Sequence, residues 1–212
     1  MPRLRLAQNG QNRIRQNAVV RVFTRSDRAT AGVVRFCNLQ FPAAIGKGGV
    51  RALKHEGDGG TPRGSWPVLQ AYYRPGRLKR PSTPLSIHPL RPDLGWCDAP
   101  DDRNYNRPVR LPYPRSAETL WRDDSLYDAI LVLDYNIRRR SANRGSAIFV
   151  HVAAPGLSPT EGCIALRREH LLKLLAVLPR GVAFAAGKNL RSSTPKSGRA
   201  NKKTQRGRRG FK

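Results

Sequence analysis

Short clusters of apolar residues recur along the chain, and most have the length of a β-strand. Val, Phe and Leu alternate or cluster over residues 19–24 and 32–41, which predicts two paired strands near the start of the fold. Residues 126–136 centre on Ala-Ile-Leu-Val-Leu, and residues 147–152 form an apolar run with β-branched and aromatic side chains, so each predicts a buried strand. We expect these last two strands to be neighbours in a mostly β core.

One segment has a helical period instead. Five leucines between residues 171 and 178 recur at helical spacing, and Pro179 and Gly181 follow as stop signals. The pattern predicts a helix over residues 167–178 that packs against the β core.

Residues 74–124 are dense in Pro, Arg and Asp and have little periodicity. Such a long stretch is usually either disordered or a functional loop. Trp96, Tyr105, Tyr113 and Trp121 indicate order, because aromatic side chains bury large areas and are depleted in disordered segments. We therefore expect a long, irregular but ordered insertion.

The same insertion carries a cluster of carboxylates. Asp98, Asp101 and Asp102 offer ligands for a hard cation, but Arg103 and Arg107 are interleaved with them, which favours surface ion pairs. Upstream of the insertion, glycine-rich turns precede residue 64 without the G-x-x-x-x-G-K-[ST] spacing of a phosphate-binding loop. Nucleotide binding is therefore not supported, and His55 in this region is expected to face solvent.

Length and charge bound the organisation. The 212 residues suffice for one domain, and the net charge is +26. We expect the chain to divide into a basic segment over residues 1–17, a domain over 18–187 and a basic tail over 188–212. The tail contains ten Lys or Arg residues and no Asp or Glu. This composition predicts that the tail is a flexible arm. Two roles stay open for the tail: contact with a polyanion such as nucleic acid, anionic lipid or wall polymer, or only solubilising the protein.

Three cysteines are too few and too scattered for a disulfide framework. Cys37 and Cys97 are expected to be small buried hydrophobic residues, with Cys97 packed beside Trp96, and a bridge between them stays open as the alternative.

The third cysteine has a setting that suggests chemistry. The 147–152 strand carries His151 near its end, and the Pro- and Gly-containing loop after it can bring Cys163 near the imidazole. An imidazole within reach supplies the base that converts a thiol into a nucleophilic thiolate, whether or not a thiolate and imidazolium are already formed. Gly162 lets the chain turn sharply and aim backbone N–H groups at an oxyanion. The alternatives are a buried structural thiol, or a zinc site with His170, although that spacing matches no common ligand pattern.

Two motifs carry a resemblance to a known family. Thr160-Glu161-Gly162-Cys163-Ile164, after a His on the preceding strand, and Thr61-Pro62-Arg63-Gly64 upstream are similar to the L,D-transpeptidase catalytic domain, the YkuD-type family. The likeness covers roughly residues 19–178. Glu161 stands where that family commonly has His, and Ala165 where it commonly has Arg. Arg167 or Arg168 is the candidate to compensate in contacting substrate.

The resemblance implies a fold, an activity and a location. The fold is β-sandwich-like, with a strand over residues 65–73 beside the site. With the residue patterns above, we expect the helix to follow the cysteine and the insertion to cover the site. Cys163 is the nucleophile and His151 the general base and acid, with Gly162 and Thr160 in the oxyanion loop and no metal or cofactor. The substrates are peptidoglycan stem peptides of a bacterial cell wall, which the enzyme cross-links or remodels, and we expect a monomer.

The expected workplace of such an enzyme is the periplasm or cell envelope. Residues 1–17 lack the apolar core, roughly 7 to 15 residues, of a secretory signal. An upstream leader, another export route and a cytoplasmic role therefore stay open. No apolar run approaches the roughly 20 residues that span a bilayer, so we expect no transmembrane segment.

Two other functions fit the sequence. An L,D-carboxypeptidase would use water in place of the amine acceptor. A basic polyanion-binding protein with a non-catalytic core would explain the charge, but it would leave the His and Gly-Cys motifs as coincidence.

Overall fold

A computed structural model describes residues 18–188 of the chain. The predicted N-terminal segment and the predicted tail, apart from Lys188, lie outside the described residues. A short parallel pair, β4 (Val50–Arg51) and β5 (Thr61–Pro62), accompanies the two larger sheets described below.

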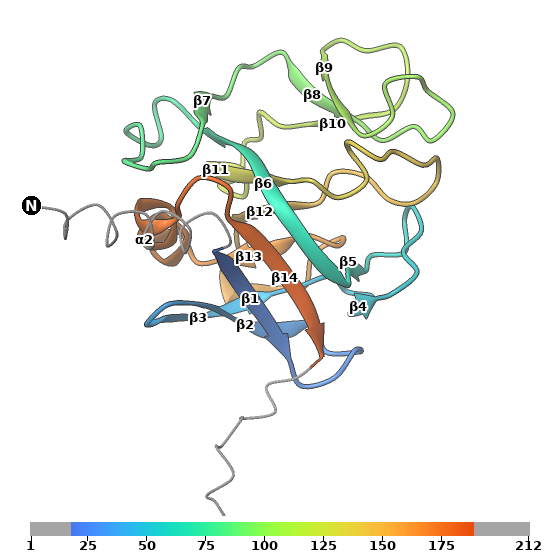
Figure 1. Cartoon of the computed structure of the whole chain (residues 1–212). Helices are drawn as coiled ribbons and strands as arrows, with labels where there is room; N and C mark the ends of the chain where they lie inside the picture. The colour runs from blue at the N-terminus through green and yellow to red at the C-terminus, as the bar shows by residue number, and fades with distance from the viewer. Residues whose placement is uncertain (1–17, 189–212) are drawn as a thin grey trace, which may run out of the picture.

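Within the described residues, nine strands form the main sheet in the order β11-β12-β13-β3-β2-β1-β14-β6-β7 (Figure 1). Their bounds are β1 Val19–Thr24, β2 Ala31–Phe36, β3 Leu39–Ala44, β6 Gly64–Tyr73, β7 Ile87–Pro89, β11 Ala129–Leu133, β12 Phe149–Val152, β13 Ile164–Leu166 and β14 Ala183–Lys188. The long β6 pairs with β14 and β7 and also with β11, so the sheet closes on itself and its halves face each other. The prediction of a mostly β, sandwich-like fold is confirmed.

The predicted strands agree with the structure, with one division missed. β1, β11 and β12 fall on or within the predicted stretches, β6 begins one residue before its predicted stretch, and β11 pairs with β12 as expected. The stretch predicted as a single strand over residues 32–41 is instead the hairpin of β2 and β3, which turns at Cys37 with φ 52°. That turn exposes Cys37, and both Cys37 and Cys97 are free thiols. The prediction of a buried or bridged Cys37 is therefore wrong.

The main core lies between the halves of the sheet and under the helix. Helix α2 (Arg168–Val177) matches the predicted helix to within a residue at each end. Its Leu171, Leu174 and Leu175 are fully buried in the cluster that also holds Leu131 of β11 and Val150 of β12.

A second apolar cluster lies on the other face of β11 and β12. Ile130, Val132 and Phe149 point into it, and residues of the insertion such as Trp96 and Leu120 cover them. All five residues of β11 are buried, because this part of the sheet is covered on both faces. The insertion is therefore part of the fold, as its aromatic residues predicted.

The insertion is less irregular than predicted. β8 (Leu94–Cys97), β9 (Arg107–Arg110) and β10 (Ala117–Thr119) form their own sheet, which lies above β11 and β12 in Figure 1. Cys97 is buried as expected, but it packs with Ala99 and Val109 and not beside Trp96. Consecutive residues of a strand face opposite sides of the sheet, and Trp96 packs on Phe149 on the other side.

The ion pairs of the insertion also differ from the prediction. Asp101 pairs with Arg115, and Asp102 accepts a hydrogen bond of 2.9 Å from the Tyr113 hydroxyl. The predicted partners, Arg103 and Arg107, form neither contact.

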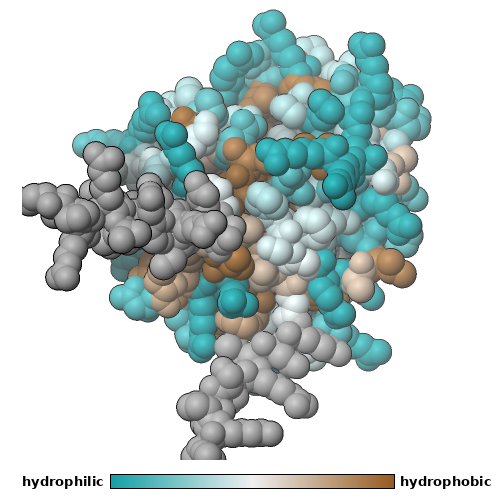
Figure 2. Space-filling view, in the orientation of Figure 1, coloured by the Kyte–Doolittle hydropathy of each residue, from teal (hydrophilic) through white to brown (hydrophobic). Residues whose placement is uncertain are grey.

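Hydrophilic side chains cover most of the face shown in Figure 2, and apolar ones form small, interrupted patches. Leu53 and Val177 are the large apolar residues that are exposed in the described part of the chain. Over the same part, none of the helices has the length and apolar character needed to cross a bilayer.

Candidate active site

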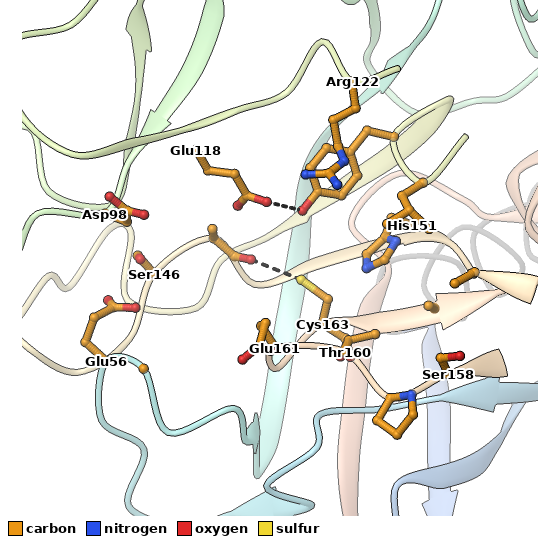
Figure 3. A pocket seen from close by; sticks show the side chains of 17 residues that line it. Glu56, Asp98, Glu118, Arg122, Ser146, His151, Ser158, Thr160, Glu161 and Cys163 are labelled. Carbon is orange, nitrogen blue, oxygen red and sulfur yellow. Dashed lines mark hydrogen bonds between the residues drawn. The ribbon is translucent and has the colours of Figure 1, made fainter. Parts of the chain in front are cut away.

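Strand register brings His151 and Cys163 together. β12 and β13 are parallel neighbours, with His151 opposite Ala165. Cys163 comes two residues before Ala165 and therefore faces the same side of the sheet as His151. Both line a cavity of about 560 Å³ between the sheet and the insertion (Figure 3). The expectation that the insertion covers the site agrees with this, because Asp98, Glu118 and Arg122 line the same cavity.

His151 is held in its basic form. Nδ1 lies 2.8 Å from the Val152 carbonyl oxygen, so Nδ1 carries the proton and Nε2 is left as the acceptor. The Tyr127 ring packs edge-on against the imidazole, with 5.2 Å between centroids. Burial, which leaves the residue 5% exposed, lowers the pKa of His151 to about 4. The imidazole is therefore neutral at neutral pH, and its Nε2 can accept a proton.

Cys163 rests as a thiol. Burial, with a smaller contribution from the nearby Glu118 carboxylate, raises its pKa to about 12 against the opposing effects of the Phe149 N–H and Lys54. Sγ accepts a hydrogen bond of 3.3 Å from the Phe149 N–H and donates one of 3.1 Å to the Ala147 carbonyl. These values favour a neutral thiol and imidazole over a preformed ion pair. The thiol proton must turn from Ala147 toward the imidazole before reaction.

Ala147, whose carbonyl accepts the thiol hydrogen bond, is anchored to the insertion through its own N–H. Asn106 is fully buried, and its Oδ1 accepts hydrogen bonds from the Trp96 indole, at 2.9 Å, and from the Ala147 N–H, at 3.0 Å. Its amide group donates to the Tyr135 and Asn136 carbonyls, at 3.0 and 2.7 Å. All four bonds together fix the orientation of the amide, so Asn106 connects the insertion to the segment that enters β12.

The loop before Cys163 depends on Thr160 and Gly162. The Thr160 hydroxyl donates to the Cys163 carbonyl at 2.7 Å and accepts from the Gly162 N–H at 3.2 Å. Gly162 has φ 131°, and a Cβ there would lie 2.8 Å from the Gly60 carbonyl oxygen, so only glycine fits. Its N–H must leave Thr160 to bind an oxyanion, and this role stays a prediction.

The Thr-Pro-Arg-Gly motif supports this loop from behind. The Thr61 hydroxyl accepts a hydrogen bond of 2.9 Å from the Gly46 N–H, and Gly46 bridges to Thr160. A Cβ on Gly46 would lie 3.0 Å from the Gly162 Cα. The two motifs, distant in sequence, thus form one packed unit.

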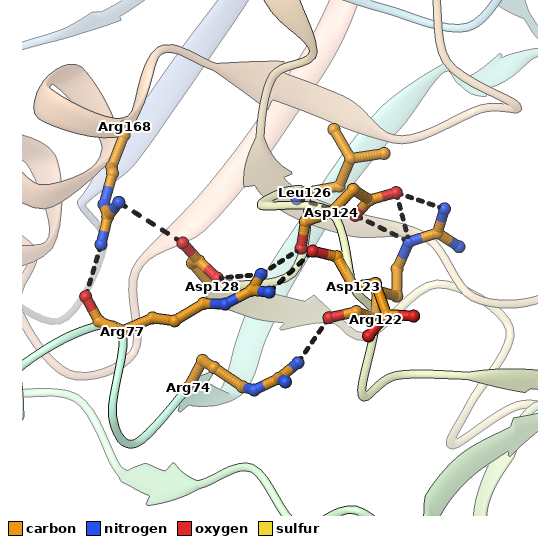
Figure 4. A network of polar contacts seen from close by, with 8 residues as sticks. All are labelled: Arg74, Arg77, Arg122, Asp123, Asp124, Leu126, Asp128 and Arg168. Carbon is orange, nitrogen blue, oxygen red and sulfur yellow. Dashed lines mark hydrogen bonds and ion pairs between the residues drawn. The ribbon is translucent and has the colours of Figure 1, made fainter.

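The predicted arginines lie away from the cavity. Arg167 is exposed, and Arg168 donates to the Arg77 carbonyl at 2.6 Å and faces the buried Asp128 carboxylate at 3.5 Å (Figure 4). Arg122 is the arginine that lines the cavity. It pairs with Asp124 at 2.6 Å.

At the two positions that depart from the family motif, the structure gives a local reason for the residue present. The Glu161 carboxylate pairs with Lys47 at 2.7 Å on the exposed rim. Ala165 is 1% exposed and lies opposite His151, where a longer side chain would fill the cavity.

Sequence reasoning missed two residues beside the pair. The Tyr127 hydroxyl donates to Glu118 Oε1 at 2.6 Å, and both side chains line the cavity. Burial raises the pKa of both groups; in Glu118, the Tyr127 hydrogen bond opposes that rise. Their segments had no motif, so only the tertiary fold reveals them.

Several other sequence expectations can be placed. His55 is exposed, as predicted. His170 stacks on Phe41, with 4.5 Å between ring centroids, and does not join His151 and Cys163. Among residues 18–188 there is no cluster of three or more His, Cys, Asp or Glu side chains placed to hold a metal ion.

Comparison with known proteins gives one result for the family and one for individual proteins. The model of the YkuD family, described as the L,D-transpeptidase catalytic domain, matches residues 32–207. This range includes both motifs and every residue of the site. A comparison with curated proteins found no match.

Proposed function

Because the chain belongs to the YkuD family of L,D-transpeptidase catalytic domains, we propose that it is a cysteine acyltransferase that acts on peptidoglycan stem peptides. The observation that best supports this is the pairing of a buried thiol with a neutral imidazole on one face of neighbouring strands. The cavity in front of them is large enough for part of a peptide. Stem peptides lie outside the cytoplasmic membrane, so we place the activity in the periplasm or cell envelope.

In the proposed acylation, the Cys163 proton passes to His151 Nε2 as Sγ attacks the amide carbonyl on the L side of an L-to-D junction. Transfer and attack are coupled, because a separated thiolate and imidazolium would be costly in a buried site. The tetrahedral intermediate then collapses. The C–N bond breaks, the leaving amine of the terminal D-residue takes the proton from His151, and a thioester remains on Cys163.

In the proposed second step, an amine of another stem gives a proton to His151 and attacks the thioester. The new amide forms, the C–S bond breaks, and the proton returns to the sulfur. The oxyanion in both steps would be stabilised by backbone N–H groups of Gly162 and Cys163. Water in place of the amine would give a carboxypeptidase.

The test is product analysis with the full chain. A stem tetrapeptide is incubated with the protein and with a second stem as acceptor, and products are identified by mass spectrometry. The proposal predicts release of the terminal D-residue together with a cross-linked dimer, and neither product with Cys163→Ser. Release with only a shortened tripeptide would replace transfer by hydrolysis. No release in the wild type, with the fold intact, would contradict the proposal.

A further inference from the structure

A lysine is buried in a turn that the proposed reaction does not use. Lys54 is 4% exposed, and its Nζ donates a hydrogen bond of 2.6 Å to Asp58 Oδ1 and one of 3.3 Å to the His55 carbonyl. Lysine is almost never buried to this degree unless it is paired, because removing an ammonium group from water is unfavourable. A buried ion pair adds little net stability, so its presence indicates a role in fixing the local structure.

Asp58 is the fixed end of this pair. Its Oδ1 also accepts from the Gly60 N–H at 2.8 Å, and its Oδ2 accepts from the His55 N–H at 2.8 Å. Burial acts to raise the pKa of Asp58, but the Lys54 hydrogen bond and these two N–H groups outweigh it and hold the pKa below its ordinary value. Asp58 is therefore a carboxylate at neutral pH, and a charged pair closes the turn over residues 54–60.

On one side, the Lys54 side chain packs against the segment that enters β12. A Cβ on Gly145 would lie 2.7 Å from Lys54 Cε, so the aliphatic part of the lysine lies directly on this glycine, which has φ 92°. A backbone N–H of the 54–60 turn also donates to the Asn143 carbonyl at 3.1 Å. Two residues after the glycine, the Ala147 carbonyl accepts the hydrogen bond of the catalytic thiol. The turn thus supports the segment that orients the thiol proton.

On the other side, Asp58 supports the loop that carries Cys163. The Gly60 N–H is bonded to Asp58, and the Gly60 carbonyl oxygen packs on Gly162, where a Cβ would lie 2.8 Å from it. Gly162 directly precedes the nucleophile. The ion pair therefore supports both the segment that contacts the sulfur and the loop that carries it.

The ammonium group also acts on the sulfur through its charge. Burial, and to a smaller extent Glu118, raises the pKa of Cys163, and the positive charge of Lys54 opposes this rise. A fixed charge in a buried site stabilises developing charge without having to reorganise. Besides His151, the titratable groups that line the cavity in front of the sulfur are Glu56, Asp98, Glu118, Arg122, Tyr127 and Glu161 (Figure 3). Lys54 lies outside this lining, so it acts on the sulfur and not on a substrate.

We propose that Lys54, through its ion pair with Asp58, is a positioning residue for Cys163. The pair holds the segments on both sides of the thiol, and the buried positive charge favours the negative charge that develops on the sulfur during attack. His151 remains the base, and Lys54 exchanges no proton in the reaction. The role of the pair in acyl transfer rests on the proposed function, but its effect on the thiol does not.

The test follows alkylation of Cys163 by iodoacetamide as a function of pH in the full chain, with intact mass spectrometry and peptide mapping. Lys54→Met retains an aliphatic side chain but removes the charge, so the pH profile should move to higher pH by about one unit. Because one pKa unit changes the thiolate fraction tenfold, the rate at neutral pH should fall by about tenfold. Asp58→Asn leaves the ammonium without its carboxylate and should move the profile to lower pH.

The opposite signs separate an effect of charge from a loosening of the turn. Both variants break the same ion pair, so a purely structural role would move both profiles in the same direction or change only stability. Arg138→Met is the matched control, because it breaks a surface pair of the same i,i+4 spacing, with Asp134 at 3.4 Å, and should leave the Cys163 profile unchanged. The exposed Cys37 is an internal reference in every protein, and its profile should not move.

The proposal requires both shifts. An unmoved profile in either variant, or movement of both in the same direction, would overturn it. If Lys54→Met does not fold, Asp58→Asn decides alone, and any result other than a shift to lower pH overturns the proposal.

Stem tetrapeptide then tests the role in acyl transfer. Lys54→Met should lower the maximal rate of acylation by about tenfold with little change in KM, because the charge acts on the sulfur. An unchanged maximal rate, or a change confined to KM, would overturn that role. Opposite shifts in alkylation without peptide acylation in the wild type would reject the proposed function and leave the positioning of the thiol standing.

Discussion

Replacing Asn106 by alanine should strongly destabilise the domain and disturb the thiol. The substitution removes the partner of two buried donors, the Trp96 indole and the Ala147 N–H. At about 1–3 kcal/mol for each unsatisfied donor, this costs about 2–6 kcal/mol, and the two carbonyls add less because they retain a second lone pair. Asn106 also has φ 56°, where alanine is strained by about 1 kcal/mol more than asparagine.

The expected loss is therefore about 3–7 kcal/mol in the free energy of unfolding, a large part of the 5–15 kcal/mol typical of a domain. Denaturant titrations of the wild type and Asn106→Ala measure this loss. Acylation rates of Cys163 in the two proteins under native conditions measure the effect on the thiol. Asn104→Ala is the matched control, because its amide donates one hydrogen bond, to the Tyr113 hydroxyl, and should cost less than about 1.5 kcal/mol. A loss below about 1 kcal/mol for Asn106→Ala would refute the view that this amide organises the site.

Three further predictions concern the catalytic pair. His151→Ala should slow acylation of Cys163 by about 100-fold or more at neutral pH, the range for removing a general base, and a wild-type rate in quenched-flow assays would make the imidazole structural. Because the His151 pKa falls from 6.5 to about 4 on folding, the unfolded state binds more protons between these values. Stability should therefore fall by about 3 kcal/mol as pH drops from 6.5 to 4, and urea titrations of His151→Asn should lack this component; an unchanged slope would argue against a buried neutral imidazole. Glu118→Gln keeps a partner for Tyr127 but removes a charge that raises the Cys163 pKa, so the pH profile of thiol alkylation should move to lower pH, and an unmoved profile would place Glu118 too far away to matter.

Local sequence patterns predicted most elements of the fold but not its second layer. The alternation of β1 and the leucine spacing of α2 depend on burial of one face, which periodicity reports directly. The hairpin at Cys37 was missed because the turn has no Gly or Pro, only a non-glycine residue in the left-handed region. The small sheet of the insertion has short strands, and strands of three or four residues leave too little pattern to detect.

The residues of the candidate site also fall into two groups, those that the sequence could identify and those that only the fold reveals. His151 and Cys163 were identifiable because their chemistry and flanking residues form a motif. Glu118 and Tyr127 come from the insertion and its exit. Only tertiary packing brings the Tyr127 ring to the imidazole and the Glu118 carboxylate to the Tyr127 hydroxyl. The charge states of the pair were also hidden, because they follow from burial, which the sequence indicates only coarsely.

The most direct measurement of the central claim is the location of a covalent adduct after reaction with stem tetrapeptide. Intact mass should rise by the mass of the acyl group without the terminal D-residue, and peptide mapping should place the adduct on Cys163. Cys37 provides a stringent internal comparison, because it is exposed whereas Cys163 is 8% exposed. Exposure alone would favour Cys37, so modification of Cys163 alone, lost in Cys163→Ser, is the result that activation by His151 predicts. An adduct on Cys37 or Cys97, or one that persists in Cys163→Ser, would contradict it.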